Sequence, residues 1–175
     1  LGAQWVDLNN DHWLDLIVIN DHNSPNQVFI NKHGLEFSRG KERYASFEVA
    51  GAHNLTAADF TNDGSIEYFM TRGMSHPAVF LNDNTSPKMV ETNTIYTDEA
   101  WSSGLSQAKL LPFTSWGSTA GDFNNDGFQD LYVANGMILP DGDSHFVPQA
   151  QNNSLFINKG NGHFKHQKGL SSQQH

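Results

Sequence analysis

Apolar residues in this chain fall in short runs separated by turns rich in Asn, Asp, Gly and Pro. Three runs, at 14–19, 66–70 and 131–134, follow an acidic segment directly. Three more, at 28–31, 79–82 and 155–158, end in Asn. Runs this short, rich in β-branched and aromatic residues, are typical of strands and too short for helices. The pattern predicts an all-β chain.

The runs recur in one order, which indicates a repeat. The acidic segments begin at Asp7, Asp59 and Asp122, which are 52 and 63 residues apart, a spacing typical of propeller and solenoid units. Each unit holds a lead-in segment, an acidic loop and two apolar strands, with a weak closing strand in the first and third units. Four short antiparallel strands describe a propeller blade. We expect one domain, 1–175, a partial β-propeller with three blades at about 1–50, 51–111 and 112–175.

The acidic loops are nine residues long and carry oxygen-bearing side chains at positions 1, 3, 5 and 9. Ca²⁺ requires several oxygens that converge from one short, tightly turned segment. Position 7 has a variable side chain and would contribute its backbone carbonyl oxygen. The predicted ligands are Asp7, Asn9, Asp11, Trp13 and Asp15 in the first loop, Asp59, Thr61, Asp63, Ser65 and Glu67 in the second, and Asp122, Asn124, Asp126, Phe128 and Asp130 in the third. The sequence predicts about three Ca²⁺ ions.

An EF-hand begins with the same spacing but needs a Glu at position 12 and two flanking helices. Position 12 is Val18, Met70 or Val133, each inside an apolar run, so a helix-loop-helix is excluded. Ordinary Asx-rich turns without an ion are the remaining alternative. Three copies in register, each with an acid at position 9, favour the metal, because uncompensated carboxylates at close range would repel one another.

Position 6 of the loop must turn sharply, which favours Gly for its access to positive φ. Gly64 and Gly127 fit, and His12 is a tolerated departure. The second loop departs further, with Thr61 at position 3 and the longer Glu67 at position 9. We therefore rank the third site strongest and the second weakest.

Charge and composition limit the classes of partner that we expect the chain to bind. Net charge is −9, with 19 acidic residues against 10 basic ones. Nucleic acid and anionic membranes require a basic face, so neither is expected as a partner. No apolar segment approaches the length that spans a bilayer, and the absence of Cys excludes disulfides and zinc-thiolate sites.

Loop plus strand, as in residues 122–135, resembles the FG-GAP/VCBS repeat of integrin-α-like β-propellers. The lead-in 115–121 and the segment 155–164 resemble the branch of cartilage acidic protein and the bacterial ASPIC/UnbV proteins. The resemblance implies Ca²⁺ in each blade, an extracellular, cell-surface or periplasmic location, and a role in adhesion or in binding a protein or glycan ligand. Three blades cannot close a ring, so the remaining blades would come from missing sequence or other copies.

No catalytic motif is present: the chain lacks H-E-x-x-H, G-x-S-x-G, a P-loop and a dinucleotide fingerprint. The loop carboxylates recur in every unit, whereas catalytic residues are normally unique to one. We therefore expect a non-enzymatic binding module, with an accessory propeller of a larger secreted hydrolase as the alternative. The third unit has an insertion within 136–153, and a variable loop on a rigid scaffold is where we expect ligand specificity.

Overall fold

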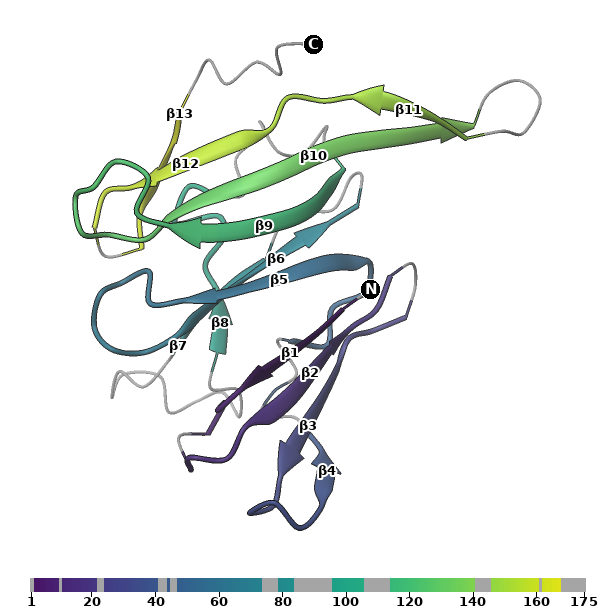
Figure 1. Cartoon of the computed structure of the whole chain (residues 1–175), viewed down its shortest axis with the longest axis vertical. Helices are drawn as coiled ribbons and strands as arrows, with labels where there is room; N and C mark the ends of the chain where they lie inside the picture. Colours follow the sequence, from purple (N-terminus) through teal and green to yellow (C-terminus); the bar gives the residue numbers. More distant parts are fainter. Residues whose placement is uncertain are drawn as a thin grey trace.

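The computed structural model describes residues 2–9, 11–21, 24–40, 44, 47–73, 79–83, 96–105, 114–140, 146–160 and 162–167. Their regular elements are strands, arranged in three antiparallel sheets that follow one another along the chain (Figure 1). The predicted all-β fold is confirmed. Within these ranges there is no helix with the length and apolarity needed to cross a membrane.

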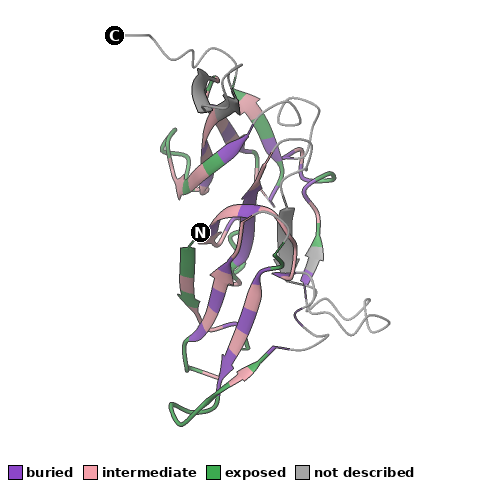
Figure 2. Cartoon of the chain, turned by 90° about the vertical axis from the view of Figure 1, so that its right-hand side faces the viewer, coloured by how far each residue is buried: buried purple, intermediate pink, exposed green. Residues whose placement is uncertain are grey.

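The first sheet has the strand order β1-β2-β3-β4. Its strands are β1 (Gly2–Val6), β2 (Asp15–Ile19), β3 (Gln27–Asn31) and β4 (Phe37–Arg39). Burial alternates along β2, because successive side chains point to opposite faces and only one face is covered. Figure 2 shows this alternation on the strands beside the exposed β1.

The second sheet has the order β5-β6-β7-β8. Its strands are β5 (Ala52–Ala58), β6 (Glu67–Arg72), β7 (Val79–Asp83) and β8 (Tyr96–Asp98). The sequence analysis assigned no closing strand to this unit, and β8 supplies it by pairing with β7. Unlike β2, β6 is buried at every position before Arg72. Both faces of this sheet are therefore covered.

The third sheet contains five strands, one more than expected for a blade. They are β9 (Ser115–Gly121), β10 (Asp130–Pro140), β11 (Phe146–Ala150), β12 (Ser154–Asn158) and β13 (Phe164–Gln167). The extra strand lies in the insertion, where β10 continues past the sheet and pairs with β11. We expected a loop at 136–153, but much of this segment is a β-hairpin that extends the apolar strand before it. Residues 141–145 lie outside the described ranges.

Two apolar cores lie between the sheets. Ile17, Ile19, Val28 and Ile30 of the first sheet pack against Leu55, Tyr68 and Met70 of the second. Phe60 and Phe69 of the second sheet pack against Leu131, Val133 and Phe156 of the third. Full burial of one such side chain contributes roughly 1.5–3 kcal/mol, so these cores fix how the sheets stack and hence where the loops lie.

Candidate metal centre

Each acidic loop joins the first two strands of its sheet. The loops follow β1, β5 and β9, and Figure 1 shows all three on the left side of the molecule. Each strand pair is antiparallel and in register up to the loop, as in the pairing of Val6 with Asp15 and of Gly121 with Asp130. The repeated hairpin therefore presents the three loops on one side of the stack.

The backbone of each loop turns through left-handed conformations. At position 6, φ is 69° at His12, 89° at Gly64 and 91° at Gly127, which confirms the prediction for this position. Position 4 also has positive φ, 61° at both Asn62 and Asn125. The sequence analysis missed this second turn, although Asn is one of the few residues that tolerate it.

The carboxylates at positions 1 and 5 hold the loop backbone. In the third loop, Asp122 accepts the N–H groups of Asp126 and Gly127 at 3.0 and 2.9 Å, and Asp126 accepts that of Phe128 at 3.0 Å. The first and second loops repeat these three bonds at 2.8 to 3.1 Å. Each carboxylate oxygen keeps a second lone pair, so these bonds leave positions 1 and 5 able to bind a cation.

Position 3 makes the contact of an Asx turn, because Oδ1 of Asn124 accepts the N–H of Asp126 at 3.0 Å and Oδ1 of Asn9 accepts that of Asp11 at 3.0 Å. The side-chain amide of Asn124 donates to Oδ2 of Asp126 at 2.8 Å, and that of Asn9 donates to Oδ2 of Asp11 at 3.0 Å. In the first and third loops, the amide thus offsets part of the charge at position 5. These contacts are compatible with both interpretations of the loops, with an ion and without one.

The acid at position 9 is buried, and it joins the loop to the second apolar strand. The two oxygens of Asp130 accept the N–H of Phe123 at 3.0 Å and the N–H of Asn158 at 2.8 Å. In the first loop, Asp15 accepts the N–H groups of Leu8 and Asn31 in the same way, at 2.9 and 2.8 Å. In these two loops, the carboxylate at position 9 is therefore a structural brace.

The second loop differs because Glu67 is one methylene longer than Asp. Its Oε2 accepts the N–H groups of Phe60 and Thr61 at 2.7 and 2.9 Å, while Oε1 lies 3.3 Å from the Thr61 hydroxyl. Oxygens of Asp59, Asp63 and Glu67 all lie within 4.8 Å of one another, and among the described residues this is the one such acidic cluster found. The ranking of the three loops as metal sites, with the second loop last, stays a prediction.

Burial and like charge perturb two of these acids. Burial raises the pKa of Glu67 to about 7, with Asp63 and Asp59 adding to the rise and the Thr61 and Phe60 amides opposing it. Burial also raises the pKa of Asp15, against the N–H bonds from Asn31 and Leu8. A bound cation would lower both pKa values, because it favours the ionised carboxylate.

The predicted ligands at position 7 have two roles in the structure. The N–H groups of Trp13, Ser65 and Phe128 donate to the acid at position 5. A Cβ atom added to Gly160 would lie 3.5 Å from the Phe128 ring, an ordinary contact, whereas one added to Gly34 would lie 2.6 Å from the Trp13 ring, which is too close for a side chain. Cation binding by the three carbonyl oxygens stays a prediction.

Two asparagines that the sequence analysis left without a role anchor the loops. The Asn31 side chain donates to Leu14 O at 3.0 Å and accepts the N–H of Gly34 at 2.8 Å. Asn158 likewise donates to Gln129 O at 3.0 Å and accepts the N–H of Gly160 at 3.0 Å. The sequence feature that could have revealed this role is the Asn that ends the second apolar run in every unit.

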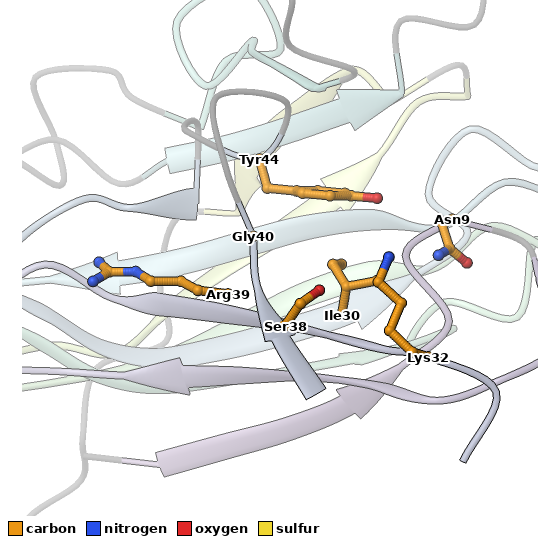
Figure 3. A pocket seen from close by; sticks show the side chains of 7 residues that line it. All are labelled: Asn9, Ile30, Lys32, Ser38, Arg39, Gly40 and Tyr44. Atoms are coloured by element: carbon orange, nitrogen blue, oxygen red, sulfur yellow. The ribbon is translucent and has the colours of Figure 1, made fainter. Parts of the chain in front are cut away.

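A cavity of about 500 Å³ lies beside the first loop (Figure 3). Asn9 of the loop lines it together with Lys32, Ser38, Arg39 and Tyr44. Arg39 lies 3.5 Å from Glu48, so its charge is partly offset. The lining combines two cations with hydroxyl groups, which suits an acidic or polyhydroxylated ligand.

A family model described as an FG-GAP-like repeat matches residues 7–70 and 59–133. The first match contains the first and second loops, and the other contains the second and third. The chain belongs to the FG-GAP-like repeat family. A comparison with curated proteins finds no match.

Proposed function

We propose that the chain is a calcium-binding repeat module whose three sheets are propeller blades at about 1–50, 51–111 and 112–175. The observation that carries the proposal is the convergence of Asp59, Asp63 and Glu67 within 4.8 Å. Calcium binds oxygens at 2.3–2.6 Å, so two ligands of one ion lie at most about 5 Å apart. The cluster fits this limit, and Ca²⁺ would offset the repulsion among the three carboxylates.

The proposal includes the first and third loops. Their acids at positions 1 and 5 hold the loop in the same way as those of the second loop. Asp15 and Asp130 brace these loops through backbone hydrogen bonds. Each of their carboxylate oxygens retains a lone pair that could bind an ion. Three Ca²⁺ ions would offset much of the net charge of −9.

The role we propose is non-enzymatic: adhesion, or binding of a protein or glycan, outside the cell. Membership of the FG-GAP-like family supports a binding repeat module. The likeness of 115–121 and 155–164 to the ASPIC/UnbV branch supports a secreted or surface location. The alternative is an accessory propeller of a larger secreted hydrolase, and hydrolytic assays on the full-length parent protein distinguish the two.

Calorimetric titration of Ca²⁺ into EDTA-treated protein tests the metal. We expect dissociation constants of about 10⁻⁴ to 10⁻³ M, as in extracellular modules. Glu67→Gln should weaken one site at least about tenfold, because it removes a charge from the cluster. Glu36→Gln, on an exposed turn outside the loops, is the matched control and should leave binding unchanged. Absence of binding at millimolar Ca²⁺ would overturn the proposal.

A further inference from the structure

A bulged histidine on β5, His53, lies where the three sheets meet. The pairing of β5 with β6 shifts between Ala52 and Asn54, so His53 is the extra residue of a β-bulge. A bulge re-aims the side chain of its extra residue. The His53 side chain is 8% exposed and contacts a residue that follows the first sheet and two residues of the third.

Trp116 is the equivalent residue of the third sheet. His53 and Trp116 each lie six residues before the start of an acidic loop, at Asp59 and Asp122. Trp116 is also the residue passed over where the pairing of β9 with β10 shifts. The two rings stack with centroids 4.4 Å apart and planes 11° from parallel. Two matched bulges therefore bring an imidazole and an indole face to face between the second and third sheets.

Both ring nitrogens of His53 face oxygen atoms. Nδ1 lies 2.9 Å from Ser115 O, and Nε2 lies 3.1 Å from Oδ1 of Asp21, which follows β2. A carbonyl and an ionised carboxylate accept hydrogen bonds and cannot donate them. A neutral imidazole carries one N–H group, whereas the imidazolium carries two. Both contacts are therefore hydrogen bonds at the same time only when the ring is protonated, and stacking on indole also favours the cation.

Asp21 is the one charged group that the described residues bring into contact with the ring. Gly73, which follows β6, borders the ring, since a Cβ atom added there would lie 3.5 Å from Cε1 of His53. Arg72 beside it donates from Nη2 to Ala50 O at 2.6 Å. The third sheet contributes a carbonyl and an indole, which do not titrate. The bonds of the ring therefore depend on its own proton and on Asp21.

A neutral His53 ring can keep only one of the two hydrogen bonds. A bond from Nε2 to the Asp21 carboxylate is charge-assisted and stronger than a bond from Nδ1 to a carbonyl. The neutral ring should therefore keep its proton on Nε2. The lone pair of Nδ1 then faces Ser115 O, and the two repel each other. The bond that is lost on deprotonation is the one to the third sheet.

The residues of the third sheet that contact His53 also hold the base of the insertion. The Ser115 hydroxyl donates to Oδ1 of Asn135 at 2.8 Å, and the Trp116 indole N–H donates to Gly136 O at 2.6 Å. From there, β10 continues into the hairpin with β11. The His53 contacts thus connect the base of this hairpin to the first and second sheets.

We propose that His53 is a proton-dependent clamp. The protonated ring ties Ser115 of the third sheet to Asp21, and loss of the proton releases the third sheet and the base of its hairpin. Imidazoles ordinarily titrate at about pH 6.5, so the clamp would respond to pH changes near neutrality. His53 lies at the opposite end of β5 from the second acidic loop, and the inference does not rest on Ca²⁺ binding.

NMR of the whole chain at about pH 5 and about pH 8, on either side of the ordinary range, tests the clamp. Nitrogen-15 spectra report which ring nitrogens carry a proton, and His53→Gln identifies the His53 signals by removing them. We expect both nitrogens to be protonated at the lower pH. At the higher pH we expect loss of the Nδ1 proton and loss of the nuclear Overhauser contact between the His53 and Trp116 rings. A proton that stays on Nδ1, or a ring contact that does not change, would overturn the proposal.

Asp21→Asn separates the effect of the proton from the shape of the site. The amide NH₂ of Asn can donate to Nε2 of a neutral ring, which leaves the Nδ1–H group to donate to Ser115 O. This variant should therefore keep the Nδ1 proton and the ring contact at both pH values. His33→Gln, the same substitution at an exposed histidine, should leave the His53 signals as in wild type. An Asp21→Asn variant that loses the ring contact at the higher pH would contradict the clamp.

Discussion

The backbone N–H of Asn158 donates a 2.8 Å hydrogen bond to the buried carboxylate of Asp130. Asp130 ends the third acidic loop and begins β10, and Asn158 ends the neighbouring strand β12, so the bond ties the loop to β12. Asp15 and Asn31 form the same bond at 2.8 Å in the first sheet. The acid at position 9 therefore braces the loop through backbone hydrogen bonds, while positions 1 and 5 lie nearer to solvent.

Asp130→Ala should destabilise the calcium-free protein by about 3 kcal/mol, because it leaves the N–H groups of Phe123 and Asn158 without their acceptor. Asp126→Ala, at an exposed position of the same loop, should cost less than about 1 kcal/mol under the same conditions. Urea denaturation in EDTA measures both. Equal losses of unfolding free energy in the two variants would show that Asp130 does not brace the loop.

Asn158→Ala should lower the free energy of unfolding by about 1 kcal/mol more than Asn31→Ala does. The two side chains make equivalent contacts within their sheets, but Asn158 also donates to Phe60 O of the second sheet. The comparison isolates one hydrogen bond between sheets, since the removed group is the same. Denaturation at a concentration where the protein is monomeric gives the difference, and a difference of zero would mean that this bond does not stabilise the stacking.

Ca²⁺ should raise the melting temperature, and EDTA should lower it, because binding to the folded loop alone adds to the free energy of unfolding. At ten times the dissociation constant, each site adds about 1.4 kcal/mol. Asp63→Ala and Asp126→Ala should each remove the contribution of one loop. Scanning calorimetry at two Ca²⁺ concentrations measures this, and Glu36→Ala should respond like wild type.

The strands and the loop turns could be predicted from sequence because they depend on local chemistry. Apolar runs such as 14–19 mark strands, and Gly64 and Gly127 mark a positive φ. The brace between Asp130 and Asn158 could not be predicted in this way, since it joins residues 28 positions apart. The hairpin formed by β10 and β11 was missed because a run of apolar residues does not show where its pairing partner begins.

Glu67 should make the stability of the calcium-free protein depend on pH. Burial raises the pKa of Glu67 from 4.5 to about 7 in the folded state, so the folded protein holds this proton more tightly than the unfolded chain. The resulting stabilisation is fully present below about pH 4.5 and is lost as the pH rises through about 7, to a limit of about 3 kcal/mol. Denaturation in EDTA across this window should show the fall, and Glu67→Gln should remove it.

Calcium should oppose this dependence. The ion and the proton compete for the same carboxylate, so affinity at the second loop should fall as the pH drops below about 7. With Ca²⁺ present, the stabilisation that the ion provides at this loop should therefore grow between pH 5 and 7 while the proton's contribution declines. Calcium titrations at several pH values measure the affinity at the second loop, and Asp63→Ala is the variant that lacks this site. A calcium response that is identical at pH 5 and pH 7 would mean that Glu67 does not bind the ion.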